Sequence, residues 1–73
     1  MKYYVTCQNK HGMIDVVSRR GNWIAPLTAD FHFYDDQLFD TKLKARCFRS
    51  FLKRTDNYFS DTDVKIQVLK KDE

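Results

Sequence analysis

The segment of residues 41–56 has a helical pattern of apolar residues, whereas apolar residues elsewhere alternate as they do in β-strands. On a helical wheel its apolar side chains fall on one broad arc, which we expect to face a core. These side chains are Leu43, Ala45, Cys47, Phe48, Phe51 and Leu52. The opposite side carries the cations Lys42, Arg46, Arg49 and Lys53. The segment therefore predicts one amphipathic helix, for which Asp40 is a suitable N-cap.

Four other segments are predicted to be strands, over residues of about 3–8, 13–19, 23–34 and 64–69. The last of them alternates strictly between apolar and polar residues, as a half-buried strand does. Pro26 interrupts the third, and because proline cannot donate to a ladder, that strand lies at an edge or is broken there. Two points stay open: whether residues 27–38 are strand or loop, and which strand pairs with the last one.

The order β-β-β-α-β favours an α+β fold with a small antiparallel sheet of three or four strands. We expect the helix to pack on one face of the sheet and water to cover the other. Strand alternation puts Ile14 and Val16 on the face that we expect to meet the helix, and Asp15 on the other face. A chain of 73 residues predicts a single domain, residues 1–73, with a thin core.

The charges are unevenly distributed along the chain. Residues 42–54 contain six Lys and Arg and no acid, whereas the rest has seven Lys and Arg against all ten acids. Like charges three or four positions apart destabilise a helix by about 0.2–0.5 kcal/mol per pair. A phosphate backbone or an acidic protein surface would relieve that repulsion. The alternative is a solvated helix face whose repulsion is screened by salt.

We therefore expect a non-enzymatic binding module that docks an anionic macromolecule, nucleic acid first, through its basic helix. The backbone contacts would come from Lys42, Arg46, Arg49 and Lys53. Arg19 and Arg20 are auxiliary candidates, because they precede a Gly21-Asn22 hairpin signal, and turn arginines beside an aromatic residue can contact nucleic acid. The alternative is that these two arginines are solvated turn residues.

A second expectation is a protein-interaction module: an adaptor, an inhibitor of a partner protein, or a homodimer. Trp23, Ile24 and Leu27 form an apolar stretch around Pro26 and are the candidate protein contacts, with an exposed sheet edge as another route. An acidic protein surface could also satisfy the basic helix. The alternative for Trp23 is that it closes the core of a small protein.

The sequence predicts no enzymatic activity, no small-molecule substrate, no cofactor and no bound metal. Cys7 and His11 have a usable ligand spacing, but His32 and Cys47 lie apart from them, unlike the paired ligands of zinc sites. We expect both thiols to be buried and both imidazoles to be at the surface. No catalytic triad motif or phosphate-binding glycine loop is present.

The N-terminus lacks the apolar run of a signal peptide, and no window approaches the ~18 apolar residues of a membrane span. Two cysteines far apart do not form the disulfide framework of a small secreted domain. We therefore expect a cytoplasmic protein that does not contact membranes.

The run Phe39–Phe48, of the form F-x-T-K-x-x-A-x-x-F, resembles the helix start in the sheet-plus-helix arm-binding domains of tyrosine recombinases. In that family the sheet enters the DNA groove. The present chain departs from the pattern by an insertion at residues 27–38 and by a final strand at residues 64–68. We therefore transfer no residue roles from that family.

Overall fold

The computed structural model describes residues 2–60 and 62–69, and it confirms the predicted α+β fold and the order β-β-β-α-β. The elements are β1 (Lys2–Gln8), β2 (Ile14–Val17), β3 (Ile24–Pro26), a 3₁₀ turn η1 (Asp35–Gln37), α1 (Lys42–Thr55), α2 (Asn57–Ser60) and β4 (Asp63–Leu69). The short helix α2 continues the chain from α1 into β4. In the described part of the chain, neither helix has the length and apolarity needed to cross a membrane.

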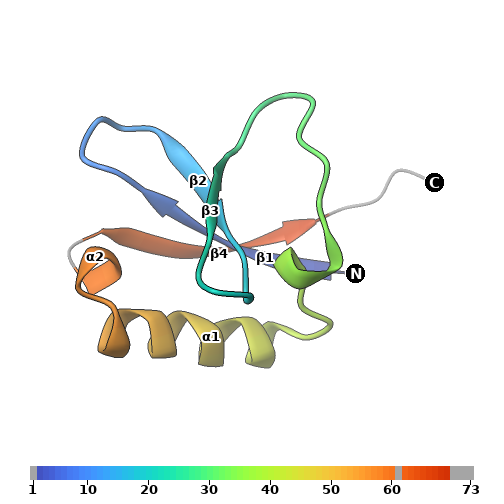
Figure 1. Cartoon of the computed structure of the whole chain (residues 1–73). Helices are drawn as coiled ribbons and strands as arrows, with labels where there is room; N and C mark the ends of the chain where they lie inside the picture. The colour runs from blue at the N-terminus through green and yellow to red at the C-terminus, as the bar shows by residue number, and fades with distance from the viewer. Residues whose placement is uncertain (1, 61, 70–73) are drawn as a thin grey trace.

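The four strands form one antiparallel sheet in the order β3-β2-β1-β4. The last strand pairs with β1 along its whole length, from Lys2 opposite Leu69 to Gln8 opposite Asp63, which answers the question that the sequence left open. The main helix α1 runs beneath one face of this sheet (Figure 1). β3 and β4 are therefore the two edges.

Two turns fix the register of the hairpins. In the β1–β2 turn, Gly12 has a φ of 83°, and the Asn9 side chain accepts the N–H of His11 at 2.8 Å. In the β2–β3 turn, Gly21 and Asn22 both have positive φ, at 70° and 54°. The N–H of Ser18 donates to the Trp23 oxygen at 2.7 Å, so the connection has four residues, 19–22, and the predicted two-residue Gly-Asn turn is wrong.

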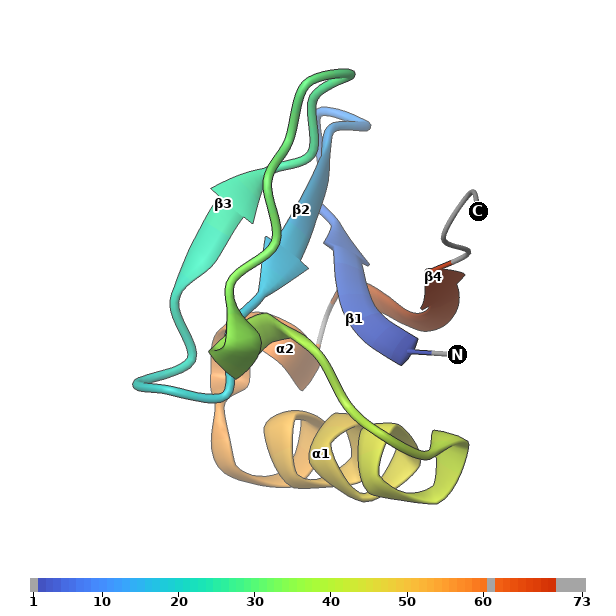
Figure 2. The same cartoon turned by 90° about the vertical axis from the view of Figure 1, so that its right-hand side faces the viewer.

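The third strand is much shorter than predicted, since only Ile24–Pro26 of the expected 23–34 pair with β2. Residues 27–34 are a loop, which runs back across β2 on the side of the sheet away from α1 (Figure 2). There the ring of Phe33 lies 4.7 Å from that of Tyr4 and 4.8 Å from that of Phe31, centroid to centroid. The expectation of a solvated second face is therefore wrong, because two phenylalanines cover part of it.

The orientation of β2 is the reverse of the predicted one. Val17 lies opposite Val5, so Val17 and Asp15 share the face that meets α1. Val16 points to the other face, where it is fully buried, and Ile14 on that face is 46% exposed. The covering loop explains the difference, because it gives Val16 an apolar environment that alternation alone does not reveal.

The core lies between the sheet and α1. It consists of Val5, Cys7, Val17, Phe39, Ala45, Leu52, Phe59 and Val64, with Tyr3, Phe48 and Ile66 packed against it. Along α1 the inward residues 45, 48 and 52 follow the i, i+3, i+7 spacing of a helix face that packs against a sheet.

The helix begins one residue later than predicted. Thr41 is the N-cap, and its Oγ1 accepts the backbone N–H of Lys44 at 3.2 Å. Asp40, the predicted cap, forms an ion pair with Lys2 instead. A hydroxyl and a carboxylate are both good N-caps, so the choice between neighbouring residues depends on the partner that β1 supplies.

Candidate interface for an anionic partner

Three of the four predicted helix cations line one groove. Lys42, Arg46 and Arg49 face the edge strand β4 across a depression of about 610 Å³. The strand side of this groove, which we call the α1–β4 groove, consists of Lys65, Ile66 and Gln67. Lys65 is a member that the sequence analysis missed. The alternation of residues 64–68 indicated a strand, but it could not show that this strand lies beside the helix.

The cations of the groove have few anionic neighbours in the part of the chain that the structure describes. The ion pairs there are Lys2 with Asp40 and Lys65 with Asp63, the second at 3.4 Å and solvent-exposed. Neither involves a cation of α1, and α1 itself contains no acid. Lys53, the fourth predicted cation, lies one turn beyond the groove, and its Nζ donates to the backbone oxygen of Thr62 at 3.4 Å.

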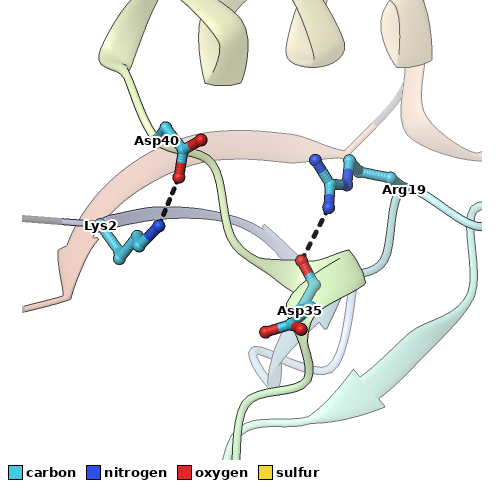
Figure 3. Close-up of polar contacts among 4 residues, drawn as sticks. All are labelled: Lys2, Arg19, Asp35 and Asp40. Atoms are coloured by element: carbon cyan, nitrogen blue, oxygen red, sulfur yellow. Dashed lines mark hydrogen bonds and ion pairs between the residues drawn. The ribbon is translucent and has the colours of Figure 1, made fainter.

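Arg19 has a structural position apart from the groove. Its Nη2 donates to the backbone oxygen of Asp35 at 2.8 Å (Figure 3), and its guanidinium lies 5.4 Å from the centre of the Phe39 ring. These contacts hold the β2–β3 turn against the segment that leads into α1. Arg20 is exposed in the same turn, which joins the two strands at the opposite side of the sheet from β4 (Figure 2). The structure thus does not bring the two arginines together with the helix cations.

The other contact drawn in Figure 3 connects the first strand to the start of the helix. Lys2 Nζ donates to the carboxylate of Asp40, and this hydrogen bond lowers the pKa of Asp40 below its usual value. Lys44 and Arg19 lower that pKa further by their positive charge. Asp40 therefore stays ionised near neutral pH, and it lies at the beginning of α1 rather than in the groove.

The predicted protein contacts lie along the other sheet edge. Trp23 is 76% exposed and Ile24 on β3 is 44% exposed, whereas Leu27 is half-buried and donates its N–H to the Ile14 backbone oxygen. Trp23 does not close the core, as one alternative proposed. Its ring instead covers Gly21 so closely that a Cβ at that glycine would lie 3.1 Å from the indole.

A row of apolar side chains on α1 points to solvent, which the sequence analysis did not predict. Leu43 is 68% exposed, Phe51 is 46% exposed, and Cys47 between them is also exposed. The sequence held a signal for this row. The six apolar residues of α1 span about 200° of the wheel at 3.6 residues per turn, which is wider than one flat sheet can cover. The expected burial of Cys47 is wrong.

The thiol of Cys7 is buried and unreactive. Burial, with a smaller effect of the Asp15 carboxylate opposite it, raises the pKa of Cys7 to about 11. Burial also raises the pKa of Tyr58, and Cys7 and Asp15 add to that rise. A thiol that stays protonated is a poor nucleophile. Within residues 2–60 and 62–69, no three His, Cys, Asp or Glu side chains lie close enough to hold a metal ion.

In comparisons with known proteins, no protein-family model, curated protein or solved structure matches the chain.

Proposed function

We propose that this chain is a cytoplasmic, non-enzymatic binding module that docks the phosphate backbone of a nucleic acid in the α1–β4 groove. The observation that carries the proposal is that Lys42, Arg46 and Arg49 line one groove, and that neither ion pair of the described residues involves them. The helix supplies these cations, and β4 supplies the other wall of the groove, where Lys65 is paired with Asp63.

The electrostatics favour a polyanion in this groove. Helix cations at positions 42, 46 and 49 repel one another, and the described residues of α1 offer no acid to offset that repulsion. On binding, these side chains would replace counterions that are condensed on the phosphates of the nucleic acid. The release of those ions favours binding. The contacts reach the backbone and not base edges, so we expect little sequence preference.

The test is a charge-reversal experiment with a duplex oligonucleotide at 50 mM salt, read by fluorescence anisotropy. Arg46→Glu/Arg49→Glu removes two groove cations, and we expect it to weaken binding by at least about 10-fold. The matched control, Lys10→Glu/Lys44→Glu, makes the same change in net charge away from the groove. An equal loss in both variants would show that binding follows net charge alone and would refute the groove.

A second candidate function is supported by the exposure of Trp23. A tryptophan that is 76% exposed beside an edge strand is a typical anchor for a protein partner or a second copy of the chain. This interaction would depend weakly on salt and would be lost in Trp23→Ala. Sedimentation of the wild type and of Trp23→Ala over a range of protein concentrations tests the homodimer. A wild type that is monomeric at all concentrations would eliminate the homodimer.

A further inference from the structure

The exposed apolar row of α1, Leu43, Cys47 and Phe51, forms one continuous ridge. The three residues are spaced at i, i+4 and i+8, so they follow a single row along the helix for about 12 Å at a rise of 1.5 Å per residue. Leu43 is 68% exposed, more than any other large aliphatic side chain among the described residues. A hollow of about 530 Å³ beside the row is lined by Leu43, Arg46, Cys47, Ser50 and Arg54.

Cations border the ridge on both sides. Arg46 and Arg54 line the hollow beside it, and Lys44 is exposed in the first turn of α1. No Asp or Glu occurs in α1. An apolar ridge bordered by cations complements one kind of surface, an apolar row bordered by carboxylates.

We propose that this ridge docks an amphipathic helix of a partner protein whose apolar row is flanked by Asp and Glu. Side chains at i±4 spacing form the ridge that packs into the groove of a second helix, and helix-in-groove recognition uses anchors at this spacing. The acids of the partner would lie against Arg46 and Arg54 on one side and Lys44 on the other.

Two other occupants fit this ridge less well. A second copy of the chain would bring two helices with six cations and no acid each into contact, at a cost in repulsion. A nucleic acid backbone would satisfy the cations and leave Leu43 and Phe51 uncovered. The inference goes beyond the proposed nucleic-acid function, because it concerns the apolar row of α1. Arg46 lines both the hollow and the α1–β4 groove, whereas Leu43 lines the hollow alone, so Leu43→Asn tests the ridge separately.

The experiment uses the full chain and a synthetic helical peptide with a leucine row flanked by glutamates. Two control peptides are a scrambled one of the same composition and one with glutamine at each glutamate. Cys47 lies in the middle of the ridge and serves as the reporter, since a bound helix would protect it from alkylation. Cys7 is fully buried and is the internal control.

We expect the glutamate peptide to bind and to slow Cys47 alkylation, and both control peptides to bind at least about 10-fold more weakly. Leu43→Asn should weaken the peptide by about 10-fold or more, as expected for an anchoring leucine. Met13→Asn, which removes an apolar side chain that is 56% exposed in the β1–β2 turn, should leave affinity unchanged. Because Leu43 is mostly exposed, its replacement does not threaten folding, which circular dichroism of each variant verifies.

Several outcomes would overturn the inference. One is equal binding of the scrambled and amphipathic peptides, or the absence of binding. Another is protection of Cys47 that increases with protein concentration in the absence of any peptide. That result would assign the ridge to a second copy of the chain. A third is protection of Cys47 by a duplex oligonucleotide whose affinity falls in Leu43→Asn, which would make the ridge part of the nucleic-acid site. Failure of the oligonucleotide to bind at all would refute only the proposed function.

Discussion

At the scale of single residues, the two cysteines show how position decides chemistry. Cys7 lies in β1, one of the two inner strands, with no exposed surface, and Cys47 lies on the solvent side of α1. Sequence patterns treat them alike, because each falls in an apolar row. The difference arises from the width of the sheet, which covers one side of the helix arc and not the other.

The reactivity of the two thiols should therefore differ strongly in the native protein. At pH 8, Cys47 should react with a maleimide at the rate of an accessible thiol, whereas Cys7 should react only after denaturation, since it is buried and protonated. Mass spectrometry of the alkylated peptides over time measures both rates. Fast modification of Cys7 in the folded chain would contradict its position in the core.

The raised pKa of Cys7 also predicts a loss of stability at alkaline pH. The thiol titrates near 9.0 when exposed and near 11 in the folded chain, so its contribution is complete below pH 9 and is lost as the pH rises toward 11. The loss from this group should be about 1–3 kcal/mol. Urea unfolding at pH 8 and pH 10.5 should show a smaller alkaline loss in Cys7→Ala than in the wild type. Cys47→Ala is the control, and an unchanged loss in Cys7→Ala would refute the assignment.

At the scale of elements, two segments differ from their sequence patterns because of contacts with residues far away in the sequence. The loop of residues 27–34 alternates apolar and polar residues like a strand, but it packs Phe31 and Phe33 on the sheet face instead of joining the ladder. The N-cap of α1 is Thr41 and not the predicted Asp40, because the Asp40 carboxylate forms an ion pair with Lys2 of β1. Local pattern cannot report either event, because both depend on residues far away in sequence.

The helix start can be tested by comparing two adjacent substitutions. Thr41→Ala removes the hydroxyl that accepts the Lys44 N–H, and it should lower the free energy of unfolding by about 1 kcal/mol. Asp40→Ala removes an exposed ion pair and should have a smaller effect. Urea denaturation measures both. A larger loss in Asp40→Ala would mean that Asp40 caps the helix.

The covering loop can be tested at Phe33. This half-buried ring packs on Tyr4 and Phe31, so Phe33→Ala should lower the free energy of unfolding by about 2 kcal/mol, less than the 3–5 kcal/mol of a fully buried phenylalanine. Tyr34→Ala, at a neighbouring residue that is 72% exposed, is the control. Equal stability of the two variants would show that the loop does not pack on the sheet.

At the scale of the whole molecule, the fold places the helix cations Lys42, Arg46 and Arg49 along one groove beside β4. The amphipathic helix and its cations were predictable from residues 42–53, because their 3.6-residue period was clear. The strand side of the groove was not predictable, since it depends on β4 pairing with β1 at the sheet edge beside α1. Arg19 was predicted as an auxiliary contact to nucleic acid. In the structure its guanidinium donates to the backbone oxygen of Asp35, which holds the β2–β3 turn in place.

This arrangement predicts a steep salt dependence for the intact protein. If the three helix cations of the groove contact phosphates, duplex affinity should fall about 40-fold between 50 mM and 200 mM salt, as the release of that number of counterions requires. Anisotropy titrations of the wild type at several salt concentrations give the slope directly. A slope near zero would indicate an uncharged contact, as in the second candidate function.

Chemical-shift mapping during titration with a duplex oligonucleotide at low salt tests the central claim most directly. We predict that the amide signals of Lys42, Arg46 and Arg49 on α1 and of residues 65–67 on β4 shift together and saturate, while those of the Arg20–Trp23 turn do not. Shifts confined to that turn, or the absence of any saturable shift, would contradict a nucleic-acid site in the α1–β4 groove.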